Sequence, residues 1–281
     1  MAGCATPVAN FAMKPEQAEA PATITFINTS TGADSYLWDF GDGMQSTDSM
    51  PTHMYPRSGQ YVVSLTAKKD NKTNTMTKPL NVDAPPTCLV EITTDYGVMV
   101  AELSDATPKH RDNFQKLAEE GYFDGLLFHR VIDGFMIQGG DPASKNAAAG
   151  TPLGSGGPGY QVPAEFVDSL VHIKGAIAAA RTGDAMNPEK KSSGSQFYIV
   201  QGSLVDDHML DGIEKKKGFT YTTEQREAYR ELGGTPFLDR DYTVFGRVIS
   251  GLEVIDAIAK VQKDSRDRPL KDVKMTVRVI R

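Results

Sequence analysis

The sequence predicts a mainly β protein of two domains. Its 281 residues suggest about two domains at the usual size of roughly 150 residues each. From residue 7 to about residue 82, short strand-like runs alternate with turn residues and show no helical period, which is typical of a β-sandwich of immunoglobulin size. After residue 86, many strand-like runs accompany only two or three helices. This second pattern favours a β-barrel closed at its ends by helices over a parallel α/β sheet.

The composition limits the partners that we expect. Hydrophobic residues make up 40% of the chain and charged residues 23%, so each domain can bury a core. The net charge of −6 at pH 7 repels phosphate backbones and anionic lipid headgroups, and we therefore expect no nucleic-acid partner. No apolar run approaches the roughly 18 residues that a membrane span needs.

The first residues carry a possible lipidation signal. Ala2-Gly3-Cys4 resembles the end of a bacterial lipoprotein cleavage box, which implies a lipid on Cys4 and a tether over residues 1–5. We therefore expect a periplasmic or outer-membrane lipoprotein of the bacterial cell envelope, with membrane contact through that lipid alone. The alternative is a tag remnant with an accidental cysteine. The second cysteine, Cys88, falls in a strand-like run and is expected to be a small buried hydrophobe without a disulfide partner.

The strands of the first domain are interrupted by one distinctive motif. Trp38 and Phe40 alternate along a strand and so share one buried face, while Asp42-Gly43 predicts a tight turn. Further residues supply the returning strands. The clearest strand-like runs cover residues 23–27, 35–40 and 60–67, and the returning residues are His53, Tyr55, Gly59, Tyr61, Val63 and Leu65.

These two stretches resemble the polycystic-kidney-disease (PKD) type domain, over residues 6–84. The resemblance implies an extracellular spacer or interaction module whose ligand is unknown. The aspartates of this domain could suggest a metal or acid/base site, but aspartates in glycine-rich turns usually accept hydrogen bonds from their own backbone. We expect that structural role for Asp34, Asp39, Asp42 and Asp48.

A stiff linker, Asp83-Ala84-Pro85-Pro86, leads into the second domain. Two strands are predicted around Asp95-Tyr96-Gly97. A helix follows, with Thr107 as its cap, Pro108 as its first residue and Gly121 as its stop. Its predicted core stripe is Phe114, Leu117 and Ala118; later features are a glycine-rich loop over residues 150–159, a helix that buries Leu252, Ile255 and Ala259, and a last strand over residues 273–280.

Three runs in the second domain carry polar and aromatic residues that simple packing does not require. They are residues 128–141, 193–199 and 237–246. Together they resemble the cyclophilin family, and the match extends from about Thr87 to Arg281 in a domain of residues 85–281. The resemblance implies an eight-stranded antiparallel barrel capped by helices, a substrate groove on its outer surface, and peptidyl-prolyl cis/trans isomerase activity on proline-containing polypeptides without a cofactor or metal.

The resemblance also assigns roles to residues. Arg130 is the implied catalytic arginine, with Gln138 and Phe135 beside it in the catalytic set. An always-charged guanidinium can donate to a proline nitrogen that has lost amide resonance, so this residue type suits the reaction. The implied pocket residues are Phe135, Met136, Tyr198, Phe237, Leu238 and Tyr242, and the implied contacts to the substrate backbone are Gln138, Gln196, Ala180 and Arg181.

Four positions depart from the best-known members of that family. Arg181 replaces asparagine, Tyr198 replaces phenylalanine, Phe237 replaces tryptophan and Tyr242 replaces histidine. The pocket stays aromatic, but the loss of an indole N–H donor puts tight cyclosporin binding in doubt. His129 is expected to be structural, the alternative being a general base.

An additional segment over residues 203–234 separates the second and third runs. Thr222 and Gln225 predict a capping box for a short helix that ends before Gly233-Gly234. The segment over residues 203–234 either flanks the groove and influences substrate choice, or it is an ordinary addition to the surface. For the whole protein, we expect a foldase for exported proteins; the alternative is a proline-segment binding protein or chaperone whose isomerase activity is incidental.

Overall fold

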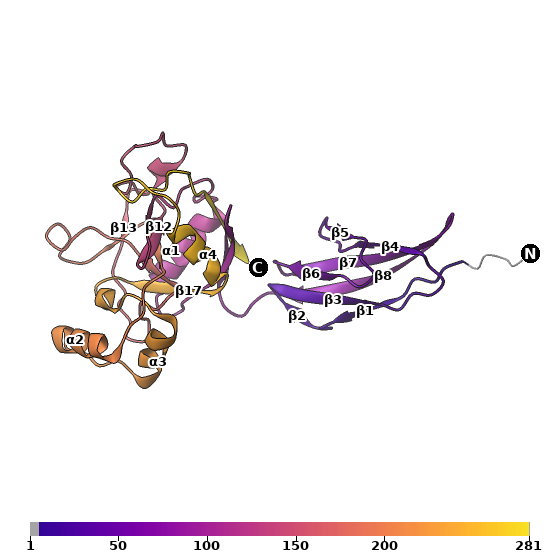
Figure 1. Ribbon diagram of the computed structural model, residues 1–281, viewed down its shortest axis with the longest axis horizontal. Helices are drawn as coiled ribbons and strands as arrows, with labels where there is room; N and C mark the ends of the chain where they lie inside the picture. Colours follow the sequence, from indigo (N-terminus) through magenta and orange to yellow (C-terminus); the bar gives the residue numbers. More distant parts are fainter. Residues whose placement is uncertain (1–5, 281) are drawn as a thin grey trace, which may run out of the picture. The chain divides into compact units, whose positions relative to one another are not determined.

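The computed structural model describes residues 6–280 and divides into two compact units (Figure 1). The first contains the chain up to Pro86 and the second covers Thr87–Val279. The predicted lipidation site at Cys4 lies outside the described residues. None of the helices in the described part of the chain is long and apolar enough to cross a lipid bilayer.

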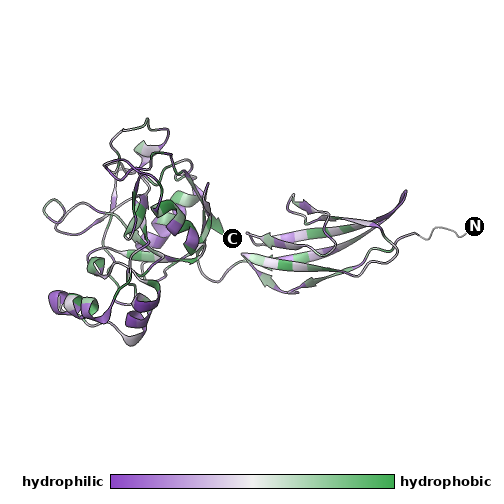
Figure 2. Ribbon diagram, viewed as in Figure 1, coloured by the Kyte–Doolittle hydropathy of each residue, from purple (hydrophilic) through white to green (hydrophobic). Residues whose placement is uncertain are grey.

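The first unit consists of two β-sheets, in agreement with the predicted sandwich. Hydrophobic and hydrophilic residues alternate along their strands, so that each sheet has one apolar face (Figure 2). One sheet has the order β1-β3-β6 and the other β2-β8-β7-β4-β5. The strands are β1 (Phe11–Lys14), β2 (Ala18–Glu19), β3 (Ala22–Asn28), β4 (Ser35–Asp39), β5 (Gln45–Ser46), β6 (Thr52–Tyr55), β7 (Gly59–Lys69) and β8 (Lys72–Asp83).

An aromatic cluster forms the core of this sandwich. Trp38 and Phe40 are both buried, which confirms that they share the inner face of their strand. The Trp38 ring lies edge-on to Phe11 with centroids 5.2 Å apart, and its indole Nε1 donates to the carbonyl of Asp48 at 2.9 Å. Tyr55 donates its hydroxyl to the carbonyl of Phe40 at 2.9 Å. The buried polar atoms of these aromatic residues are therefore satisfied.

The carboxylates of Asp39 and Asp42 accept hydrogen bonds from nearby backbone amides, as predicted. Asp39 accepts a hydrogen bond from the amide of Gly41 at 2.9 Å, and this bond is the main reason that its pKa lies below the ordinary value. Asp42 accepts from the amide of Met44 at 3.0 Å and also contacts His53 Nε2 at 2.7 Å. These carboxylates hold the turn after β4 in place.

The second unit is built on an eight-stranded antiparallel sheet that curls into a barrel, which confirms the predicted fold. The strand order is β11-β12-β16-β14-β17-β10-β9-β18. The barrel closes where the segment before β11 meets the last strand: Leu127 bridges Lys274, and the amide of Phe128 donates to the carbonyl of Val273 at 2.9 Å. The strands are β9 (Leu89–Thr94), β10 (Gly97–Leu103), β11 (Arg130–Ile132), β12 (Met136–Gly139), β14 (Ala176–Ala179), β16 (Phe197–Val200), β17 (Val244–Ser250) and β18 (Met275–Ile280), with a separate pair β13 (Gln161–Val162) and β15 (Ser192–Ser193).

Two helices, α1 (Pro108–Glu119) and α4 (Leu252–Ala259), pack into the barrel core. The predicted stripe of α1 is buried, and Gly121 follows its end with a φ of +67°, which favours glycine. On α4, Ile255 and Ala259 are buried as predicted, whereas Leu252 is only partly buried.

The expected cap of α1 is wrong in one respect. Thr107 precedes the helix, but its hydroxyl donates to the carbonyl of Ser104 at 3.4 Å instead of capping. The carboxylate of Glu165 accepts from the amides of Lys109 and His110 at 3.2 and 3.0 Å and takes that role. A cap supplied from 55 or more residues away leaves no local pattern in the sequence.

Cys88 also differs from its prediction. It lies just before β9 and is half-buried, with its thiol 3.5 Å from the side-chain oxygen of Gln115. Burial raises the pKa of this thiol, so the group stays protonated and unreactive at neutral pH.

The segment over residues 203–234 forms a helical pair, α2 (Asp207–Lys217) and α3 (Thr223–Leu232) (Figure 1). The predicted capping box of Thr222 and Gln225 is present. Helix α2 was not predicted, because it buries only Leu210 and shows no apolar stripe. Its inner side belongs to a small cluster of Ile173, Val205, Leu210, Tyr221 and Tyr229. We call residues 203–234 the helical insertion.

Candidate active site

The outer face of the barrel carries a second apolar cluster. Successive residues of a strand point to opposite faces, so Phe197 and Ile199 of β16 fill the barrel while Tyr198 between them faces outward. The same alternation on β12 buries Ile137 in the barrel and turns Met136 outward. The regular geometry of the sheet, rather than a loop, therefore presents these outward side chains.

A hollow of about 180 Å³ lies over this outer cluster. It collects side chains from β11, β12 and β16, from the chain after β14, and from the turn η2 (Pro236–Leu238) and the residues that follow it. Its lining residues are Arg130, Phe135, Met136, Gln138, Ala180, Arg181, Tyr198, Leu238 and Tyr242.

A row of hydrogen-bonded polar side chains borders the hollow. Arg130 stands directly opposite Gln138 in the β11–β12 register, and its Nη1 donates to Gln138 Oε1 at 3.3 Å. Gln138 Nε2 donates to Gln196 Oε1 at 3.2 Å, and Gln196 Nε2 donates to the carbonyls of Gly154 and Gly156 at 3.0 and 2.7 Å. The row fixes the orientation of both amides. Within residues 6–280 the guanidinium makes no other hydrogen bond, and its ion pair with Asp267 is long, at 3.9 Å from Nε.

The opposite side of the hollow is apolar and aromatic. The rings of Tyr198 and Tyr242 meet edge-on with centroids 5.9 Å apart. Tyr198 is buried, and this burial raises its pKa well above the ordinary value, so it remains a neutral phenol. The hollow thus combines an aromatic wall with the guanidinium of Arg130 in its lining.

Two of the implied substrate contacts lie outside the hollow itself. Gln196 lines an adjoining hollow of about 480 Å³ beside the glycine-rich loop. Phe237 stands at the rim, 53% exposed, with its ring 5.8 Å from that of Phe135.

Two other residues line the hollow but use their polar groups elsewhere. The amide of Ala180 donates to the carbonyl of Gln196 at 3.0 Å, so it is not free for a substrate. Arg181 turns its guanidinium toward the protein, where Nε donates to the carbonyl of Asp241 at 2.7 Å and the charged group lies 4.5 Å from the Tyr242 ring centroid. Its side chain therefore supports the aromatic wall.

His129 lies behind Arg130 and is buried. Neither of its ring nitrogens has a hydrogen-bond partner among the described residues, and burial lowers its pKa below the ordinary value. The ring is therefore neutral at physiological pH. It borders another hollow, of about 520 Å³, that shares Arg130 and Gln138 with the first one.

Comparison with known proteins matches each of the two units to a protein family. The family model described as "Cyclophilin type peptidyl-prolyl cis-trans isomerase/CLD" matches residues 89–279. The chain belongs to the cyclophilin family. A PKD-domain model matches residues 4–84.

Bacterial relatives support the assignment of the cyclophilin domain. A protein of Staphylococcus saprophyticus that is named for peptidyl-prolyl cis-trans isomerase activity is 38% identical over 184 residues, which are 64% of this chain and 85% of that protein. A Streptococcus pyogenes protein, whose name combines a phosphatase with a peptidyl-prolyl cis-trans isomerase, is 41% identical over 190 residues. The match covers 66% of this chain but only 37% of the length of the streptococcal protein.

A solved structure supports the fold. The cyclophilin-type peptidyl-prolyl cis-trans isomerase of Cryptosporidium parvum superposes with a TM-score of 0.50 at 24% identity, covering 69% of this chain and 98% of the other.

The cyclophilin domain contains one group of site residues that the sequence did not reveal. His172 and Asp239 are buried behind Tyr198, and His172 Nε2 lies 3.0 Å from the Tyr198 hydroxyl. The sequence held a single clue: a tyrosine stands where the best-known cyclophilins have phenylalanine, and a buried phenol requires a polar partner.

Proposed function

We propose that this cyclophilin accelerates the proline-limited folding of exported proteins in a bacterial cell envelope. Arg130 at the border of an apolar hollow carries the enzymatic part of this proposal. The PKD domain, followed by a proline-containing linker, serves as a spacer or interaction module. A lipid on Cys4 anchors the protein to the membrane and is its only membrane contact.

The reaction requires rotation about a prolyl bond, not bond cleavage. Resonance between nitrogen and carbonyl gives this rotation a barrier of roughly 18–20 kcal/mol, as for peptide bonds in general. In the twisted state the proline nitrogen regains a lone pair, and Arg130 can donate to it only then, so the interaction favours the transition state over the ground state. The apolar residues hold the ring while Gln138 fixes the guanidinium.

Isomerase turnover on a proline-containing peptide tests this function. The wild type should accelerate cis/trans exchange, and Arg130→Ala should lose most of the rate while it still binds the peptide. Loss of peptide binding together with turnover would indicate that Arg130 only supports the fold. Failure of the wild type to accelerate exchange would disprove the proposal.

A second function has structural support. The two larger hollows share residues with the proline site and together offer room for an extended polypeptide, which favours a proline-segment binding protein or chaperone with incidental turnover. Suppression of aggregation of an unfolded client by both wild type and Arg130→Ala supports this alternative. If only the wild type suppresses aggregation of the client, the result supports the enzymatic function.

The proposed location is tested separately. Mass analysis of the N-terminus of the protein purified from its native membrane should reveal a diacylglyceryl-modified Cys4 as the first residue. If the native protein retains Met1 or lacks a lipid, it is not a lipoprotein. The proposed enzymatic function would be unaffected by that result.

A further inference from the structure

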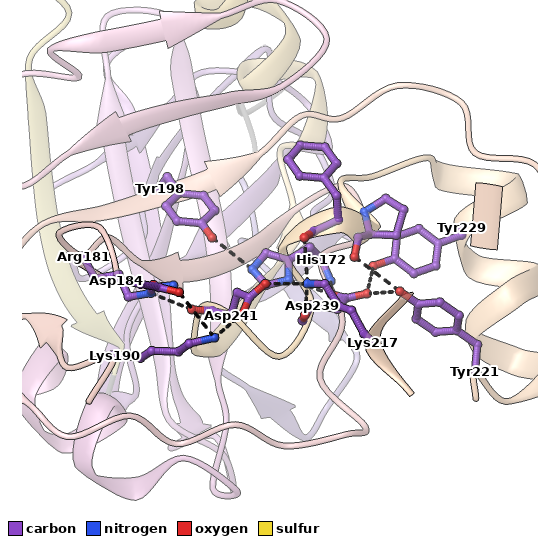
Figure 3. A network of polar contacts seen from close by, with 12 residues as sticks. His172, Arg181, Asp184, Lys190, Tyr198, Lys217, Tyr221, Tyr229, Asp239 and Asp241 are labelled. Carbon is purple, nitrogen blue, oxygen red and sulfur yellow. Dashed lines mark hydrogen bonds and ion pairs between the residues drawn. The ribbon is translucent and has the colours of Figure 1, made fainter. Parts of the chain in front are cut away.

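A buried carboxylate links the helical insertion to the cyclophilin barrel. The side chain of Asp239 is 3% exposed. Its Oδ1 accepts from the amide and the Nδ1 of His172 at 2.8 and 2.7 Å, and its Oδ2 accepts from the hydroxyls of Tyr221 and Tyr229, both at 2.6 Å (Figure 3). A carboxylate offers about four acceptor positions, and all are used. Half of the donors come from the helical insertion.

The same carboxylate determines how His172 meets the proline hollow. Nδ1 of His172 is held by Asp239, and the other ring nitrogen, Nε2, lies within hydrogen-bond distance of the Tyr198 hydroxyl, at 3.0 Å. The ring of Tyr198 lines the hollow. Figure 3 shows these groups as one continuous chain of contacts that runs from Tyr221 and Tyr229 through Asp239 and His172 to Tyr198.

A second contact from the helical insertion reaches the same side of the hollow. Lys217, at the end of α2, donates to the carbonyls of Phe237 and Asp239 at 2.8 and 2.6 Å and pairs with the carboxylate of Asp241 at 2.7 Å. This ammonium group therefore holds the turn between η2 and β17. Leu238, the last residue of η2, and Tyr242, within that turn, both line the hollow.

We propose that the helical insertion positions the aromatic wall of the proline site. In this view Tyr221, Tyr229, Asp239 and His172 are positioning residues that act through Tyr198, and the inference rests on the proposed isomerase function. The wall contacts the proline ring in both the planar and the twisted state. Displacement of the wall should therefore weaken binding in both states and raise KM more than it lowers kcat.

The test compares full-length variants on a proline-containing peptide. The Tyr221→Phe/Tyr229→Phe double variant keeps both rings and removes two donors to Asp239. KM should rise about threefold or more, while kcat stays within about twofold of the wild type. The matched control is Arg230→Gln, which removes an exposed ion pair with Asp207 on the same insertion and should leave both constants unchanged.

A double-mutant cycle separates positioning from general stability. Tyr198→Phe should raise KM by a similar factor, and the double tyrosine substitution should add nothing further in that background, because the contact chain is already broken. Independent, multiplying effects would overturn the inference, as would an unchanged KM combined with a lower melting temperature. Tyr229→Phe alone replaces the double variant if the latter does not fold.

Peptide binding gives an independent readout. The Kd of the same peptide, measured by NMR titration, should rise in parallel with KM. If the wild type binds peptide but shows no turnover, the proposed isomerase function fails, and the Kd values still decide the positioning inference. If Kd is equal for wild type, Tyr198→Phe and the double tyrosine variant, the positioning inference fails even though turnover is normal.

Discussion

Arg130 and Gln138 face each other across the β11–β12 pair, and the guanidinium of Arg130 donates to the amide oxygen of Gln138 at 3.3 Å. Neither residue lies on a flexible loop. The antiparallel register therefore fixes the cation at the border of the proposed proline site before a substrate arrives, so that the proposed reaction needs no reorganisation of the charge.

Substitution of Arg130 should reveal this preorganisation. Removing one transition-state donor commonly reduces rates by about 10²–10³. We expect Arg130→Ala to lose about that factor in kcat/KM, and Arg130→Lys to retain little of the activity, because an ammonium group lacks the planar fork. A coupled peptide isomerisation assay measures both. Arg247→Ala, which removes an exposed arginine outside the hollow, is the control and should keep full activity.

The isomerisation rate should change little between about pH 6 and pH 9. Arg130 does not titrate in this range. Burial lowers the pKa of His129 and raises that of Tyr198, so the neutral form of each side chain is favoured in this range. The check is kcat/KM measured across the range in buffers of constant ionic strength. A bell-shaped profile would indicate that a titrating side chain takes part in the reaction.

The sequence predicts the parts of the site that lie on strands better than those that depend on distant contacts. The shared inner face of Trp38 and Phe40 follows from the two-residue period of a strand. The family resemblance, not a local pattern, implied that Tyr198 lines a pocket. The Glu165 cap of α1 and the Asp239 carboxylate depend on residues far apart in the chain, and no local spacing reveals them.

The stability of the cyclophilin domain should fall as the solution is acidified. The pKa of His129 is lowered in the folded state, chiefly by burial, from an ordinary value of 6.5. Below that value the unfolded chain takes up a proton that the folded chain does not, so the folded state loses stability as the pH falls from about 7 to 5. The pKa of His110 is lowered for the same main reason and adds to this loss.

His129→Phe tests the first of these contributions. Neither ring nitrogen of His129 has a hydrogen-bond partner among residues 6–280, so an apolar ring of similar shape should cost little stability at pH 7. The variant should lose less of its melting temperature than the wild type between about pH 7 and 5. The exposed His208 supplies the control, His208→Gln, whose pH dependence should match that of the wild type. Equal pH dependence in all three proteins would contradict the prediction.

Disruption of the PKD core should leave short-peptide turnover intact. Trp38 is fully buried, and replacing such a residue with alanine typically costs about 3–5 kcal/mol. Trp38→Ala should lower or abolish the thermal transition of the first unit, measured by calorimetry, while kcat/KM on a short peptide stays at the wild-type level. A parallel loss of turnover would mean that the PKD domain supports the catalytic domain directly and is more than a spacer.

Phe237 offers a way to change inhibitor binding without changing the reaction. Its ring stands at the rim, 53% exposed, and packs against Phe135 outside the hollow proposed to hold the proline. Phe237→Trp keeps an aromatic rim and adds an indole N–H donor. One added hydrogen bond is worth about 0.5–1.5 kcal/mol, which corresponds to roughly two- to twelvefold tighter binding. We therefore expect cyclosporin inhibition to strengthen by that factor in a competition assay, while kcat/KM changes by less than about twofold, because Phe237 does not line the hollow that contains Arg130 and Gln138. If inhibition does not change, the weak point in cyclosporin binding lies elsewhere in the groove, and Arg181 and Tyr242 are then the departures to restore next.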